Sequence, residues 1–209
     1  MRRKLYPTLA AALLSFAALL APTTPASANV AAANVAAAGA ASAPGPEPQP
    51  NNVGVNGFFS VDPAQQGSNF LAAIVMEIPR GLHVNSNKPL GKYAVPTTVK
   101  VDAPRGLRIT PVSYPRGTVR TFSFGGAAAD RLAVYEDRAI FRFAVNVAPD
   151  MELGVARVRV NVRFQSCNDE VCFPPVTREL VLAIAIVDRN TPVNRINGRY
   201  FGTGGGRRR

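Results

Sequence analysis

Two cysteines, Cys167 and Cys172, are the residues of this 209-residue chain whose type and spacing could support chemistry. They are the only cysteines of the chain, and four residues separate them. A regular alternating pattern ends just before Cys167, and Pro174 and Pro175 lie between Cys172 and another apolar stretch. Two cysteines at the junction of two strands can form a structural disulfide, or a redox site that opens and closes by thiol–disulfide exchange.

The N-terminal residues have the pattern of a secretory signal peptide, which we expect to span residues 1–28. Arg2, Arg3 and Lys4 form its positive start, an Ala/Leu-rich run covers residues 9–20, and small residues at 26–28 suit cleavage. The apolar run is too short to span a bilayer comfortably. We therefore expect an exported, periplasmic protein with no stable membrane insertion.

Export decides how the cysteine pair is interpreted, because an oxidising compartment permits a disulfide. Two cysteines and one histidine do not complete a Cys/His zinc site, so we expect neither a metal nor another cofactor. A structural disulfide is the commoner use of a lone pair in an exported β-protein. A ring this short, however, contributes only about 2 kcal/mol by chain entropy. The short ring favours a redox role, and the structural alternative stays open.

Asp169 and Glu170 lie between the cysteines and place negative charge near both sulfurs. Negative charge raises the pKa of a thiol and disfavours the reactive thiolate. We expect a pair that reacts slowly with random disulfides and exchanges mainly with a docked partner. The alternative is that Asn168, Asp169 and Glu170 are only the polar tip of a hairpin.

The formal net charge is +11, from 24 basic and 13 acidic residues. Most arginines are scattered along predicted strands, which is typical of a solvated sheet face. No nucleic-acid motif or interleaved aromatic pattern accompanies them, so we expect no nucleic-acid partner. No Ser/His/Asp or paired-carboxylate arrangement predicts another enzyme chemistry. His83, the single histidine, is of a type that is more often structural than an acid–base group.

The elements around the cysteines are predicted to be strands. Apolar or alternating runs predict them at residues 69–78, 93–101, 107–112, 139–147, 156–164 and 180–186. Within 156–164 the apolar residues alternate with Arg157, Arg159 and Arg163, which indicates a half-buried antiparallel strand. Helical periodicity is weak, and only residues 127–132 suggest a single turn. The sequence therefore predicts an all-β fold, an immunoglobulin-like antiparallel β-sandwich in a single domain.

The predicted domain organisation follows the changes in composition. Residues 29–52 are rich in Ala and Pro, and we expect a linker there. Residues 53–190 contain the predicted strands and form one domain. Residues 191–209 end in glycines and arginines, and we expect a flexible basic tail.

Three stretches resemble one known family. Gln165-Ser-Cys-Asn-Asp-Glu-Val-Cys-Phe-Pro-Pro-Val176 is similar to the active-site hairpin of the N-terminal periplasmic domain of the thiol:disulfide interchange protein DsbD. Gly81-Leu-His-Val-Asn-Ser-Asn87 resembles a strand near that site. Phe122-Ser-Phe-Gly-Gly126, followed by Val134 and Tyr135, resembles the cap loop and the strand after it. The resemblance covers roughly residues 55–187.

The resemblance implies an immunoglobulin-like domain with a redox-active disulfide between Cys167 and Cys172. Such a domain passes electrons between a membrane electron transporter and thioredoxin-fold periplasmic proteins through mixed disulfides. This chemistry would make the chain a thiol–disulfide oxidoreductase. The resemblance implies that Cys172 links to the partner and that Cys167 resolves the link, an order that the residues alone do not settle. Full-length family members continue into transmembrane and thioredoxin domains, so we expect a stand-alone module here.

The same resemblance implies further site residues. Phe122 and Phe124 would be cap residues that shield the disulfide, with ordinary strand packing as the alternative. His83 and Tyr135 would lie near the cysteines. The best-known family members have tyrosines on the strand that here contains His83. The competing function for the whole chain is a non-catalytic β-sandwich binding module whose disulfide is purely structural.

Overall fold

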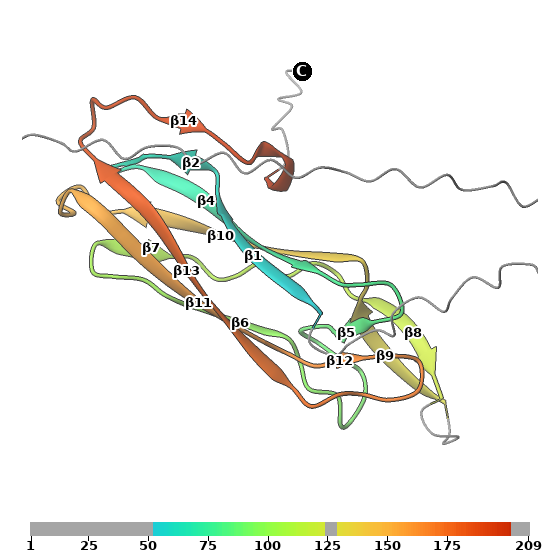
Figure 1. Cartoon of the computed structure of the whole chain (residues 1–209). Coiled ribbons are helices and arrows are strands. Elements are labelled where there is room, and N and C mark those ends of the chain that lie inside the picture. The colour runs from blue at the N-terminus through green and yellow to red at the C-terminus, as the bar shows by residue number, and fades with distance from the viewer. Residues whose placement is uncertain (1–51, 124–128, 202–209) are drawn as a thin grey trace, which may run out of the picture. The chain divides into compact units, whose positions relative to one another are not determined.

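Long strands with alternating apolar residues form two facing four-stranded sheets (Figure 1). The structure, a computed structural model, describes residues 52–123 and 129–201. One sheet has the order β1-β4-β10-β7 and contains Gly54–Phe59, Asn69–Glu77, Arg138–Val147 and Leu107–Ile109. The other has the order β3-β13-β11-β6 and contains Ala64–Gln65, Val176–Val187, Gly154–Phe164 and Thr98–Asp102. All neighbours are antiparallel except β13 and β3.

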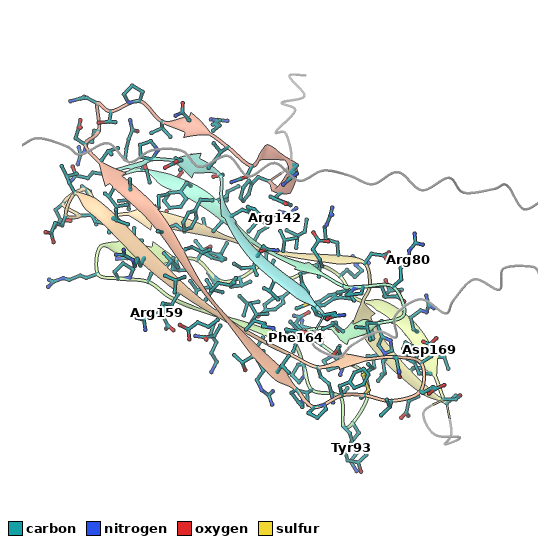
Figure 2. All side chains as sticks on the ribbon, viewed as in Figure 1. Arg80, Tyr93, Arg142, Arg159, Phe164 and Asp169 are labelled. Atoms are coloured by element: carbon teal, nitrogen blue, oxygen red, sulfur yellow. A yellow bond between two sulfur atoms is a disulfide. The ribbon has the colours of Figure 1, made fainter. Side chains whose placement is uncertain are left out.

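The core lies between these two sheets and follows the strand alternation. On β11 the residues Val158, Val160 and Val162 are fully buried, while the arginines between and beside them face solvent. Figure 2 shows Phe164 of β11 inside the sandwich and Arg159 on its outer surface. Burying one face of each strand removes large apolar surfaces from water, which is the main stabilising contribution to such a fold. The predicted all-β, immunoglobulin-like sandwich is confirmed.

A third, smaller sheet lies at one end of the sandwich and carries the cysteine hairpin (Figure 1). Its order is β12-β5-β9-β8, and its strands are Ser166–Cys167, His83–Asn85, Asp130–Tyr135 and Thr118–Phe122. A single residue, Gln165, separates the end of β11 from the start of β12. The longest-range core strand therefore leads directly into the first cysteine, so core packing fixes where that cysteine begins.

Several predicted elements differ from the observed ones. In the stretch predicted at 93–101 only Thr98–Asp102 is a strand, because Pro96 interrupts it and proline cannot donate to a sheet. The strand predicted at 107–112 ends at Ile109, ahead of Pro111. The single turn suggested at 127–132 is wrong for its last three residues, which begin β9; residues 127 and 128 lie outside the described ranges.

The segment after β13 is packed, which corrects the expectation of a flexible tail from residue 191. Asn194–Arg195 forms β14 and pairs with β2, Val61–Asp62. The 3-10 helix η2, Gly198–Tyr200, then brings Tyr200 onto Phe58, with ring centroids 4.2 Å apart. Tyr200 also packs against the outward-facing side chains of Ala73 and Val75. Tyr200 supplies the apolar surface that holds a segment with little strand pattern of its own.

Helices long and apolar enough to cross a bilayer are not found within residues 52–123 and 129–201.

Candidate redox site

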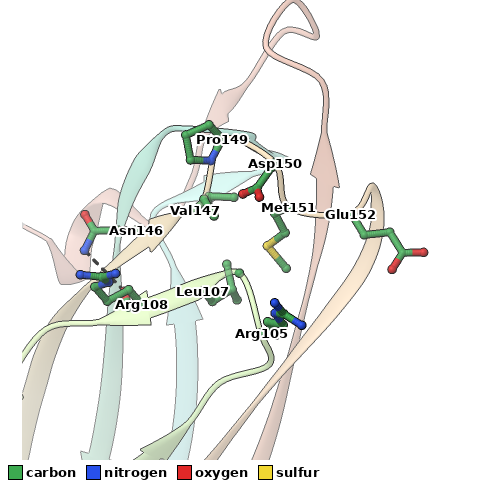
Figure 3. Close-up of a pocket in the computed structure, with 11 residues that line it drawn as sticks. Arg105, Leu107, Arg108, Asn146, Val147, Pro149, Asp150, Met151 and Glu152 are labelled. Atoms are coloured by element: carbon green, nitrogen blue, oxygen red, sulfur yellow. Dashed lines mark hydrogen bonds between the residues drawn. The ribbon is translucent and has the colours of Figure 1, made fainter.

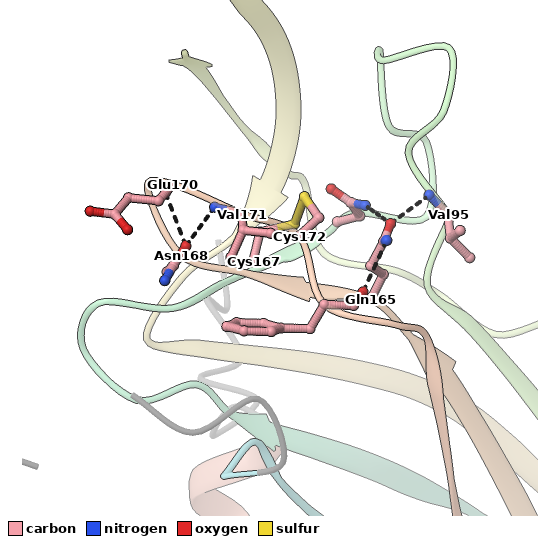
Figure 4. The surroundings of a disulfide bond; sticks show 9 residues. Val95, Gln165, Cys167, Asn168, Glu170, Val171 and Cys172 are labelled. Atoms are coloured by element: carbon pink, nitrogen blue, oxygen red, sulfur yellow. Dashed lines mark hydrogen bonds between the residues drawn. A yellow bond between two sulfur atoms is a disulfide. The ribbon is translucent and has the colours of Figure 1, made fainter. Parts of the chain in front are cut away.

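The two cysteines form a disulfide across a tight hairpin turn (Figure 4). Cys167 ends β12, and Cys172 lies directly opposite it in an isolated antiparallel bridge. Asn168 builds the turn between them. Its backbone N–H donates to the carbonyl of Val171 at 3.0 Å, and its Oδ1 accepts the backbone N–H groups of Glu170 at 2.9 Å and Val171 at 2.7 Å. Asparagine favours such turns because its side chain bonds to the backbone two residues ahead.

Gln165 anchors the base of the hairpin to two other segments (Figure 4). Its Oε1 accepts from Asn85 Nδ2 at 2.9 Å and from the backbone N–H of Val95 at 3.1 Å. Its Nε2 donates to the carbonyl of Phe173, just past Cys172, at 3.1 Å. One side chain thus connects β5, the loop before β6 and the returning arm of the hairpin. This arrangement fixes the position of the hairpin relative to the small sheet.

The two sulfur-bearing residues differ in their access to solvent. Cys167 is completely buried, whereas Cys172 is half-buried. Val171, next to Cys172, has 48% of its surface exposed. A thiolate must approach a disulfide sulfur directly in order to attack it. The accessible sulfur of this pair is therefore that of Cys172.

His83 lies on β5 directly opposite Cys167 in the strand register. Residues opposite each other in an antiparallel pair share one face of the sheet, with Cβ atoms about 5 Å apart. The imidazole is 3% exposed and stacks on the ring of Phe122, with centroids 4.0 Å apart. Burial lowers the pKa of His83 to about 4; the nearby charge of Asp169 opposes this shift and that of Arg120 adds to it. His83 is thus a neutral group beside the buried cysteine.

The structure places the other aromatic residues of the predicted site as follows. Phe122 is buried at the end of β8, where it packs with Leu132 and Val134 and stacks on His83. Phe124, the second predicted cap residue, lies outside the described residues, and its role stays a prediction. Tyr135 pairs with the residue that follows His83 on β5.

The Tyr135 hydroxyl joins the loop that follows β5. It donates to Asn87 Oδ1 at 2.9 Å and accepts from the Asn87 backbone N–H at 3.1 Å. Burial raises the pKa of Tyr135. Since an uncharged hydroxyl can both donate and accept a hydrogen bond, Tyr135 acts here as an anchor for the loop.

The acidic pair is exposed at the tip of the hairpin. Asp169 and Glu170 both face solvent, and the backbone N–H of Glu170 belongs to the Asn168 turn. Asp169 is close enough to His83 to act on its pKa, so its charge reaches the interior of the site. The polar-tip interpretation and the electrostatic interpretation therefore both describe this segment.

Sequence reasoning quoted Gln165 as part of a motif but gave it no role, and it gave none to Asn85. Asn85 is fully buried and donates to Gln165 Oε1. A polar residue between apolar strand positions is the signal that could have singled out Asn85, because buried polar side chains need partners. The contacts of Gln165 join residues up to 80 positions apart, which local patterns do not reveal.

A separate hollow lies at the far end of the sandwich from the disulfide (Figure 3). It is lined by residues 105–108 and 146–152, none of which is a cysteine or a histidine. Arg105, Asp150 and Glu152 lie around its rim (Figure 3). Among the described residues, no group of three or more His, Cys, Asp or Glu side chains could hold a metal ion. The disulfide hairpin is thus the candidate site.

Comparison with known proteins points to the same hairpin. A family model described as thiol:disulfide interchange protein DsbD, N-terminal, matches residues 49–184, more than half of the chain. The DsbD N-terminal domain of Neisseria meningitidis, solved in its reduced form, is 19% identical; the match covers 68% of this chain and 88% of that one, with a TM-score of 0.38.

The N-terminal periplasmic domain of ScsB from Proteus mirabilis is another similar structure. It is 9% identical, the match covers 64% of this chain and 46% of that one, and the TM-score is 0.42. None of the curated proteins matches the sequence of this chain.

Proposed function

Because this chain belongs to the family of DsbD N-terminal domains, we propose that it is a thiol–disulfide exchange module that relays electrons through its Cys167–Cys172 disulfide to thioredoxin-fold partners. The observation that carries this proposal is the unequal burial of one short disulfide, with Cys172 half-buried and Cys167 fully buried at a hairpin tip. A purely structural bridge has no need of an approachable sulfur.

The chemistry proceeds in two exchanges. A thiolate of the electron donor attacks Cys172 Sγ, the Cys167–Cys172 bond breaks, and its electron pair stays on Cys167 Sγ. A second thiolate of the donor then attacks the mixed disulfide and releases Cys172. The donor leaves as a disulfide, and this chain gains two electrons and two protons as a dithiol. The same steps in reverse reduce the disulfide of an acceptor.

We place this relay in the periplasm. A membrane electron transporter would supply the electrons, and thioredoxin-fold periplasmic proteins would exchange them with Cys172. The signal-peptide pattern of residues 1–28 supports export. Phe122, and Phe124 with it, would restrict access to the disulfide until a partner docks.

The reduction potential of the disulfide tests the relay against the binding-module alternative. Structural disulfides usually have potentials below about −300 mV. We expect a less negative value, measured by equilibrating the purified protein with a thioredoxin-fold protein of known potential. A value more negative than about −300 mV would indicate a structural bridge and overturn the proposal.

Trapping a partner tests which sulfur forms the intermolecular bond. The Cys167→Ser variant keeps the accessible Cys172 and removes the thiol that would resolve a mixed disulfide. We expect this variant to accumulate mixed disulfides with thioredoxin-fold proteins, seen as reducible bands on a non-reducing gel. The matched control is Cys172→Ser, whose remaining thiol is buried and should trap far less. Equal trapping by both variants would contradict the assignment of Cys172.

A further inference from the structure

His83 is the polar side chain that the strand register brings to the buried cysteine. It lies opposite Cys167 in the pairing of β5 with β12, so both side chains share one face of the small sheet. Stacking on Phe122 holds the imidazole plane from the side of β8. A ring fixed by a strand and by an aromatic neighbour keeps one orientation toward the hairpin.

The charges that face His83 come from two elements. Asp169 lies on the hairpin tip, and Arg120 lies on β8. The effects of these charges on the imidazole are opposite in sign, and burial leaves the ring neutral at neutral pH. A neutral imidazole still carries one N–H donor. Its capacity to donate a hydrogen bond therefore does not depend on pH across the neutral range.

Opening the disulfide creates a need for such a donor. When a thiolate attacks the accessible Cys172, the electron pair of the broken bond stays on Cys167. That sulfur is fully buried, and burial disfavours a charged thiolate. A thiolate that receives a hydrogen bond from a nearby N–H is stabilised and is a better leaving group.

We propose that His83 is a positioning residue for the exchange reaction, because its imidazole N–H stabilises the thiolate of Cys167 as the disulfide opens. This inference rests on the proposed function and deepens it, since it explains why the bond breaks toward Cys167. The attacking thiol gives its proton to water, and the Cys167 thiolate later takes a proton from water, so the step is balanced. His83 neither gains nor loses a proton overall.

Glutathione is the probe for the first test, because it reacts without any protein partner. The oxidised protein is mixed with glutathione, quenched with acid, and the adduct is located by mass spectrometry of peptides. We expect glutathione on Cys172. Glutathione mainly on Cys167 would overturn the proposal, and this result requires no variant.

Two variants provide the second test. His83→Phe keeps a ring on Phe122 but removes the N–H, whereas His83→Gln keeps an N–H donor. We expect opening by glutathione at pH 7 to be roughly tenfold slower in His83→Phe and within about threefold of the native rate in His83→Gln. Equal rates in all three proteins would overturn the proposal, as would slowing in both variants to the same extent.

A third measurement separates a positioning role from a merely structural one. Cys167 is alkylated over a range of pH in the Cys172→Ser background, with and without His83→Phe. We expect the pH midpoint of alkylation to rise by about one unit when the N–H is removed. An unchanged midpoint would overturn the proposal. Failure of transfer to thioredoxin-fold partners, with these glutathione results intact, would instead count only against the proposed function.

Discussion

At the residue scale, burial of His83 has a consequence for stability that is separate from exchange. Its pKa is lowered to about 4 in the folded protein, whereas an unfolded chain has a histidine pKa of about 6.5. Between these values the unfolded chain binds a proton that the folded protein does not. The free energy of unfolding therefore falls as the pH decreases through this window, and it levels off below about pH 4.

We predict that His83 contributes up to about 3 kcal/mol to the loss of stability between pH 7 and pH 4. The measurement is urea unfolding of the oxidised protein at pH 7, 5.5 and 4, compared with His83→Phe. The variant should lose less stability over this range, because phenylalanine binds no proton in either state. Acidic groups titrate similarly in both proteins, so the difference isolates His83. Identical pH dependence in the two proteins would contradict the prediction.

At the element scale, three segments of the small end sheet depend on Gln165. Replacing it with leucine leaves the Val95 N–H, the Asn85 side chain and the Phe173 carbonyl without this partner. Buried groups that lose a partner cost about 1–3 kcal/mol each, less where water can reach them. We predict that Gln165→Leu lowers the free energy of unfolding by about 2–3 kcal/mol and speeds hydrogen exchange at Val95.

Gln165→Glu is the matched control for this prediction. It keeps the oxygens that accept from Asn85 and Val95, and it loses only the donor to Phe173. Protection of the Val95 N–H should therefore persist in Gln165→Glu while the returning arm of the hairpin loosens. If Gln165→Leu left the exchange rate at Val95 unchanged, the anchoring role would be wrong.

The elements also show which parts of the fold could be predicted. The long strands β10, β11 and β13 were predictable, because each buries one full face and the alternation extends over at least nine residues. The short strands β5 and β12 have only three and two residues, too few for a period to emerge. Their place is set by pairing with distant strands, and only the family resemblance pointed to them.

The site divides in the same way. The cysteine pair and its polar tip were visible because their chemistry is local in sequence. The pairing of His83 with Cys167 joins residues more than 80 positions apart and depends on the register of two strands. The difference in burial between the two cysteines likewise arises from three-dimensional packing, which no spacing encodes.

At the scale of the whole molecule, the segment after β13 crosses the outer face of the β1-β4-β10 sheet. Arg142 Nε donates to the Tyr200 carbonyl at 2.7 Å, and Asn197 Nδ2 donates to the Phe59 carbonyl at 2.9 Å. We predict that Tyr200→Ala lowers the free energy of unfolding by about 2 kcal/mol, because its ring is 8% exposed and stacks on Phe58. Urea unfolding measures this loss.

Tyr93→Ala is the control for that substitution, since Tyr93 is 85% exposed. We expect it to change stability by less than about 0.5 kcal/mol. Neither variant should alter the rate of opening by glutathione, because Tyr200 packs on a sheet that does not contain β12. Equal effects of the two substitutions on stability would show that the segment contributes nothing by packing.

The hydrogen bonds of the hairpin do not involve sulfur. Asn168 closes the turn and Gln165 holds its base whether or not the disulfide is intact. After reduction, the two thiols therefore stay near each other at a high effective concentration. A partner bound to Cys172 would be displaced almost as soon as it attached, so its residence time would be short. Rapid turnover of many partners, with little accumulation of any covalent complex, is the behaviour that this turn would impose on the intact protein.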